Sequence, residues 1–187
     1  MKSGQFYKRF TAKNGKEVVL RSMKWEDIDS VLKYADDLYQ EWENNLSFGV
    51  PMSKKPTFEE EGRWLADNLL SIEQGKQVCV VAEVDGKLAG CSQVDKPQNI
   101  AMSHYGDLGI SLSKEFRDTG IGSEMMKTLL DESRKAGFVF IELKVFSSNP
   151  RAIHLYEKMG FKQTGRVPSK IIRNGNQIDD IIMVIEL

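Results

Sequence analysis

The clearest chemical signal in the sequence is the stretch Arg117-Asp118-Thr119-Gly120-Ile121-Gly122-Ser123. It follows an apolar run, 108–112, that predicts a strand, and it opens a segment, 121–136, whose apolar residues recur at helical spacing. A glycine pair at the start of a helix leaves the first backbone N–H groups unpaired and uncovered by Cβ atoms, and the helix dipole adds partial positive charge there. The pattern therefore predicts a seat for a diphosphate.

Three kinds of phosphate-binding loop begin in this way, and the spacing separates them. A P-loop has Lys and then Ser or Thr after its last glycine, whereas Ser123 and Glu124 stand there. A dinucleotide-binding loop needs a third glycine in place of Met125, although Glu142 lies at about the distance of a ribose-binding acid. Five residues, 113–117, also separate the strand from the loop, too many for the tight turn of that motif. What remains is the spacing Arg-x-x-Gly-x-Gly.

A second motif follows at residues 149–161, with the sequence NPRAIHLYEKMGF. Together with Arg-x-x-Gly-x-Gly, it resembles the two signatures of the GNAT superfamily of N-acetyltransferases. The start of the chain, a strand at 17–21 and then a helix rich in acidic residues, also resembles the start of that family. The resemblance covers essentially the whole chain.

The hydrophobic pattern and the turn residues predict an order of elements that matches this family. Strands are expected at 17–21, 77–84, 87–94, 102–112, 138–146, 162–172 and 177–187, with helices at 25–42, 57–75, 121–136 and from 150 onwards. The expected fold is a mixed α/β GNAT fold, a six- to seven-stranded twisted sheet with about four helices on its faces. We expect one domain over residues 1–187, in which residues 1–16 are an N-terminal extension.

The resemblance implies acetyl-CoA as the acetyl donor. In the GNAT fold, the strand before the glycine loop and the next strand, here 138–146, run parallel and splay apart, so that pantetheine pairs with free backbone groups. An N-cap role alone would also explain Asn149, and a solvated surface charge would explain the Arg117 side chain. Carried over by motif position, the cofactor-binding residues are Ile110, Ser111, Leu112, Arg117, Asp118, Thr119, Gly120, Ile121, Gly122, Ser123 and Asn149.

The resemblance also implies direct attack by the acceptor amine in a ternary complex, without an acyl-enzyme. Tyr156 would protonate the leaving thiolate, since a tyrosine at this point of the second signature commonly does so in the family. A plain core tyrosine, packed with Leu155 and Met159, is the alternative. A backbone N–H within 110–112 would stabilise the oxyanion.

An acceptor amine must lose a proton before it attacks, so a general base is expected. Glu142 is the first candidate, because its strand borders the splayed cleft, although a surface pairing with Lys144 would explain it too. Some relatives carry a glutamate where Lys144 stands, so other bases remain open, namely Asp107, His104 and Glu83.

The amino-acid composition limits the classes of partner that the protein can have. The 26 basic and 27 acidic residues give a net charge of −1, so no long-range field directs the protein to nucleic acid or to anionic lipid. No apolar segment has the length of a signal peptide or a membrane span, which favours a cytoplasmic protein. The hairpin expected around Asp85 and Gly86 would turn Cys79 and Cys91 to opposite faces, and the cysteines and histidines lack the spacing of metal ligands.

The two motifs do not identify the acceptor of the acetyl group. Residues 43–56 predict a loop whose apolar residues either line the acceptor pocket or pack over the edge of the core. The main hypothesis is an N-acetyltransferase acting on a primary amine: a protein N-terminus, a lysine or a small molecule. The alternatives are an acyl-CoA sensor of the same fold and a dinucleotide-dependent oxidoreductase. The sequence leaves the oligomeric state open, a homodimer included.

Overall fold

A computed structural model of the chain describes residues 2–49, 52 and 54–187. Eight strands form one mixed sheet in the order β1-β2-β3-β4-β5-β6-β8-β7. Only β5 and β6 pair in parallel, and every other neighbouring pair is antiparallel. The strands are β1 (Phe6–Thr11), β2 (Glu17–Arg21), β3 (Gln77–Val84), β4 (Lys87–Asp95), β5 (Tyr105–Leu112), β6 (Phe140–Phe146), β7 (Lys162–Arg173) and β8 (Asn176–Glu186).

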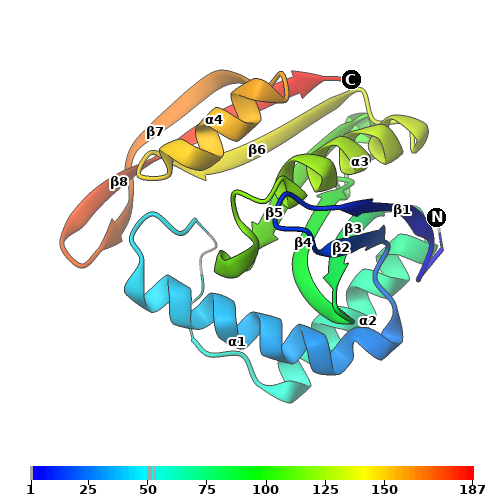
Figure 1. Ribbon diagram of the computed structural model, residues 1–187. Coiled ribbons are helices and arrows are strands. Elements are labelled where there is room, and N and C mark those ends of the chain that lie inside the picture. The colour runs from blue at the N-terminus through cyan, green and yellow to red at the C-terminus, as the bar shows by residue number, and fades with distance from the viewer. Residues whose placement is uncertain (1, 50–51, 53) are drawn as a thin grey trace.

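Helices cover both faces of the sheet (Figure 1). They are α1 (Ile28–Asn44), α2 (Phe58–Glu73), α3 (Ile121–Lys135) and α4 (Pro150–Lys158), with short 3-10 turns η1 (Trp25–Asp27), η2 (Ile100–Met102) and η3 (Lys114–Phe116). The buried residues of α3 and α4 share one core cluster, and those of α1 and α2 share the other, against the opposite face of the sheet. None of the helices in the described ranges is both long enough and apolar enough to cross a membrane.

The α/β fold predicted from the sequence is confirmed, with one strand more than expected. Residues 6–11, placed by the prediction in an N-terminal extension, form β1 and pair with β2. This strand lies at the edge of the sheet, and its side chains are exposed or only partly buried. Because it lacks the buried apolar run that marks the inner strands, periodicity alone did not find it.

The register of the β3–β4 hairpin corrects one prediction. A bulge between Ala82 and Glu83 shifts the pairing by one residue, so that Cys91 lies opposite Val81. A shift of one residue moves every later side chain to the other face. Cys79 and Cys91 therefore share a face instead of pointing apart, and both are buried, free thiols in the core cluster under α1 and α2.

Candidate active site

The parallel pair β5–β6 separates part of the way along its length. The two strands pair from Tyr105 with Phe140 to Leu108 with Leu143. Beyond that point β5 runs on to Leu112 and β6 to Phe146, with no pairing between them in the described chain. The predicted splay is therefore present, and it opens toward the glycine loop that follows β5.

The pairing with β4 decides which backbone groups of β5 face this opening. Ser113 donates its N–H to the carbonyl of Ala89 at 2.9 Å, and the register continues without a bulge from there. Because antiparallel pairing alternates, Ser111 turns its amide groups to β4, while Ile110 and Leu112 turn theirs to the splay. Of the three residues predicted on β5, two thus offer backbone groups to a ligand in the opening.

The glycine loop leads into the N-terminus of α3. Gly120 is the N-cap residue, with φ of 90°, and no side chain caps this helix. By contrast, side chains cap α2 and α4, since Thr57 accepts from the Glu60 N–H and Asn149 accepts from the Ala152 N–H. The first-turn N–H groups of α3, which have no partner inside the helix, are therefore left to an anion.

The three elements that would hold a cofactor meet at Gly122. A Cβ atom added there would lie 3.7 Å from a side-chain carbon of Leu112 and 4.0 Å from one of Leu155. The start of α3, the free end of β5 and α4 therefore converge. An extended ligand in the splay would reach the N-terminus of α3 directly.

The Arg117 side chain is held by other residues of the protein. Its guanidinium donates to both carboxylate oxygens of Glu41, at 2.5 and 2.6 Å, and to the carbonyl of Leu112, at 3.0 and 2.8 Å. The alternative of a solvated surface charge therefore does not describe this side chain. Asp118, with φ of 64°, forms an ion pair with Arg151 at 2.9 Å, and the Thr119 hydroxyl donates to the Phe116 carbonyl.

The acceptor loop was predicted at 43–56, but residues 43 and 44 belong to the end of α1. The next described residues, 45–49, touch both sides of the opening. The Ser148 hydroxyl, beyond β6, donates to the Leu46 carbonyl at 3.1 Å. On the β5 side, the guanidinium carbon of Arg117 lies 5.5 Å from the centre of the Phe48 ring. Phe48 is buried in the core cluster of α1 and α2, so this apolar residue packs over the core edge. Val50 and Pro51 lie outside the described residues.

The tip of the β7–β8 hairpin fixes this segment (Figure 1). Arg173 lies over the Trp42 ring, 3.5 Å from its centre, and donates to the Trp42 carbonyl. It also donates to the carbonyls of Asn45 and Phe48, at 3.2 and 3.3 Å. The end of α1 therefore receives a cation where its last carbonyl groups lack helical partners.

Tyr156 is buried on α4, with its ring centre 6.0 Å from that of Phe161. Burial raises the pKa of its hydroxyl to about 12. In the part of the chain that the structure describes, the hydroxyl makes no hydrogen bond. It therefore keeps its proton at neutral pH.

Three carboxylates form a row across the sheet just before the splay. Asp95 pairs with Asp107, and Asp107 pairs with Glu142, so all three point to the face covered by α1 and α2. Glu142 accepts from the Tyr105 hydroxyl at 3.1 Å and pairs with Lys144 at 3.2 Å, as the surface-pairing alternative expected. Burial raises the pKa of Asp107, which the Glu142 and Asp95 charges also raise, against the opposing effect of Lys144.

The other two candidate bases lie elsewhere. Glu83, on β3, is bound to Arg21, with 2.8 Å between charged atoms. His104 precedes β5 at the closed end of the strand pair, where its carbonyl accepts from Val139 and Phe140. Among the described residues, no three His, Cys, Asp or Glu side chains are grouped as metal ligands would be.

Sequence reasoning missed two residues of α1 that hold the free end of β5. The Tyr34 hydroxyl donates to the Ser111 hydroxyl at 2.9 Å, and Glu41 binds Arg117. Tyr34, Leu38 and Glu41 follow one another at helical spacing on the core-facing side. The sequence did offer a signal for Glu41, because an acidic residue on the apolar face of a helix needs a hydrogen-bonding or charged partner.

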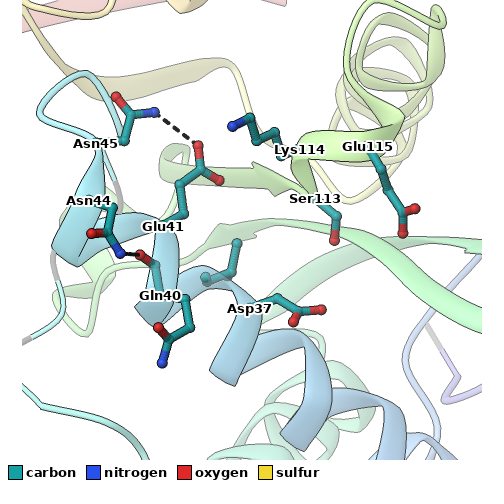
Figure 2. A pocket seen from close by; sticks show the side chains of 9 residues that line it. Asp37, Gln40, Glu41, Asn44, Asn45, Ser113, Lys114 and Glu115 are labelled. Carbon is teal, nitrogen blue, oxygen red and sulfur yellow. Dashed lines mark hydrogen bonds between the residues drawn. The ribbon is translucent and has the colours of Figure 1, made fainter.

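A cavity of about 690 Å³ lies beside α1, near its C-terminal end (Figure 2). It runs between α1 and the start of η3 and is lined by Asp37, Leu38, Gln40, Glu41, Asn44, Asn45, Ser113, Lys114 and Glu115. Of the residues described above, Leu38, Glu41, Asn45 and Ser113 border it. None of the residues predicted to bind the cofactor or to catalyse the reaction lines it.

A sheet opened between two parallel strands, with an uncapped, glycine-led helix at the opening, is the arrangement that the sequence resemblance implied for an acyltransferase. The sequence model described as "Acetyltransferase (GNAT) family" matches residues 32–161. The chain belongs to this acetyltransferase (GNAT) family. The resemblance seen in the sequence is thereby confirmed.

Named relatives and a solved structure agree with this assignment. The L-amino acid N-acetyltransferase AaaT of Escherichia coli is 32% identical over 105 residues, 56% of this chain and 65% of that protein, so the chain spans less than two thirds of it. An N-alpha-acetyltransferase of Sulfurisphaera tokodaii is 26% identical over 165 residues, 81% of this chain and 84% of that protein. The crystal structure of a phosphinothricin acetyltransferase from Sinorhizobium meliloti in complex with acetyl-CoA has a similar fold (TM-score 0.76, 22% identity, 95% of this chain and 89% of that one).

Proposed function

We propose that the protein is an N-acetyltransferase that transfers an acetyl group from acetyl-CoA to a primary amine by direct attack in a ternary complex. The observation that carries the proposal is the continuity of two features. The amide groups of β5 that face the splay lie beside the uncapped N-terminus of α3. An amide-containing arm and a diphosphate, which coenzyme A joins in one molecule, fit these two features in that order.

In this proposal, acetyl-CoA supplies an acetyl group activated as a thioester. The N–H of Ile110, turned to the splay, stabilises negative charge on the acetyl oxygen. Tyr156 gives its hydroxyl proton to the sulfur as the carbon–sulfur bond breaks, and solvent later restores that proton. The carboxylates beside the splay remove the proton that the amine loses as its nitrogen bonds to the acetyl carbon, directly or through water.

We assign proton removal to Asp107 and a supporting role to Glu142, which reverses the order expected from the sequence. The Tyr105 hydroxyl and the Lys144 ammonium group occupy the two carboxylate oxygens of Glu142, which leaves that carboxylate less free to take a proton from an amine. Asp107 is exposed and forms no ion pair within the described chain, and partial desolvation, with the charges of Glu142 and Asp95, raises its pKa. A carboxylate with a raised pKa is the better proton acceptor near neutral pH.

The acceptor proposed here is an α-amino group, of a free amino acid or of a peptide N-terminus. Two relatives support this choice, because their names specify an L-amino acid and an N-alpha position as the sites of acetylation. An α-amino group has a pKa near ~8, more than two units below that of lysine. It therefore needs less help from a base as weak as a carboxylate.

A turnover screen tests the proposed function. The full chain is incubated with acetyl-CoA and a panel of L-amino acids, peptides with varied first residues, and polyamines, while release of the CoA thiol is measured. We expect release that depends on an α-amino group and a product heavier by one acetyl group. Tight binding of acetyl-CoA without turnover on any amine would identify an acyl-CoA sensor instead. Protection from thermal unfolding by NAD(H) but not by CoA would favour the oxidoreductase.

The conformation of Gly120 allows a matched test of the diphosphate seat. Gly120 and Gly137 lie at the two ends of α3 with φ of 90° and 86°, so Ala at either position costs roughly 1–2 kcal/mol of stability. Only Gly120 lies in the loop that we assign to the diphosphate, so any relaxation of its strained backbone would shift the N–H groups there. We expect it to raise the KM for acetyl-CoA by about 10-fold, with Gly137→Ala leaving KM unchanged.

Equal KM values for the two variants would show that this loop does not bind the diphosphate. Steady-state kinetics at a temperature well below both unfolding midpoints separates the effect on binding from the shared loss of stability.

A further inference from the structure

The Arg117 guanidinium is fully engaged by the protein itself. It forms two hydrogen bonds with the Glu41 carboxylate and two with the Leu112 carbonyl, and it lies over the Phe48 ring. The Arg117 and Glu41 side chains are only 21% and 11% exposed. Burial by itself would raise the pKa of Glu41, but the hydrogen bonds and charge of Arg117 lower it overall, helped by Asn45. The pair is therefore charged and held in one geometry.

In a sheet without a splay, the neighbouring strand would have donated an N–H to the Leu112 carbonyl. It belongs to the last residue of β5 and points away from β4, into the opening. Arg117 donates to this carbonyl where no strand is paired with it. It thereby fixes the peptide groups of β5 that would pair with the pantetheine arm.

The same contacts join this strand to the acceptor side. Glu41 lies near the end of α1, and its carboxylate accepts from the Asn45 side-chain amide at 3.0 Å, as Figure 2 shows. Asn45 begins the segment that continues to Phe48, the residue over which Arg117 lies. The largely buried Arg117–Glu41 ion pair therefore connects residues 45–48, α1 and the free end of β5.

We propose that the Arg117–Glu41 pair is a positioning pair, which aligns the pantetheine-binding backbone of β5 and does not bind the diphosphate. The inference rests on the proposed use of acetyl-CoA. It changes the role of the first residue of the Arg-x-x-Gly-x-Gly motif, since a charge beside a phosphate loop would ordinarily be assigned to the phosphates.

Two acetyl donors separate the roles, because S-acetylpantetheine has the pantetheine arm and lacks the diphosphate. For Arg117→Met we expect kcat/KM to fall by roughly 10- to 100-fold with acetyl-CoA and by the same factor with S-acetylpantetheine. Glu41→Gln should lower both values in the same way, although it removes no positive charge. A side chain that binds the diphosphate predicts a loss only with acetyl-CoA, and no loss for Glu41→Gln.

Arg117→Lys provides the second comparison. Lysine keeps the positive charge, but it cannot span Glu41 and the Leu112 carbonyl with one planar fork. We expect it to behave like Arg117→Met with both donors. The double variant Arg117→Met/Glu41→Gln should have a kcat/KM no lower than that of the less active single variant, because both substitutions break the same ion pair. Full activity of Arg117→Lys would overturn the inference.

The control is Arg134→Met, which breaks an exposed ion pair with Asp131 near the end of α3 and should leave both donors unaffected. Circular dichroism verifies the fold of each variant. If Arg117→Met does not fold, Glu41→Gln and Arg117→Lys decide the question by the same donor comparison. A parent protein that uses neither donor refutes the proposed function, whereas an active parent whose variants lose activity only with acetyl-CoA refutes the positioning role alone.

Discussion

Replacing Tyr156 by Phe is expected to lower kcat by about 10²–10³-fold and to leave the affinity for CoA unchanged. The tyrosine hydroxyl is the only group the substitution removes, and the packing of the ring against Phe161 remains. Because burial raises the pKa of this hydroxyl to about 12, Tyr156 is protonated over the whole working range and can act as the acid. Steady-state turnover gives kcat, and calorimetric titration with CoA gives the affinity.

The matched control for this substitution is Tyr39→Phe. Tyr39 lies on the exposed side of α1, and its hydroxyl donates to Glu43 at 2.6 Å. Its loss should change neither kcat nor affinity. An unchanged kcat for Tyr156→Phe would assign Tyr156 to the core alone, as its burial by itself would suggest.

Replacing Asp107 by Asn is expected to lower kcat/KM by about 10²–10³-fold, because an amide cannot accept the proton of the amine. Glu142→Gln should cost about 10-fold or less, since Glu142 supports its neighbour through charge and is itself held by Tyr105 and Lys144. Steady-state kinetics with the best amine of the screen measures both. A larger loss for Glu142→Gln than for Asp107→Asn would return the role of base to Glu142.

The pH dependence gives an independent check of the same assignment. Asp107 accepts a proton only when ionised, so the rate falls as the pH falls through its pKa. Because burial and the neighbouring acids raise this pKa, the acid limb of the profile lies above the usual range of an aspartate. Asp107→Asn should abolish this limb. Since the two carboxylates interact, the limb in the parent protein belongs to the pair.

The sequence by itself determined most of the fold and the class of the protein. Seven of the eight strands and all four α-helices are marked by apolar periodicity, and the caps Thr57 and Asn149 lie where the pattern placed them. Such signals are local, because they depend on residues within a few positions of one another. The family follows from two local motifs, and the splay of β5 and β6 follows from the family.

Only the tertiary structure decided how the side chains are paired. The role of Arg117 depends on Glu41, which is 76 residues away in the chain and comes close to it only because α1 packs across the end of β5. A single bulge at Ala82 and Glu83 reversed the predicted facing of the cysteines, and the edge strand β1 lacked any buried apolar run. Asp107 and Glu142 became a pair through strand register. Contacts between distant segments and one-residue shifts of register produce no periodic pattern in a sequence. The partners of these side chains could therefore be identified only from the tertiary structure.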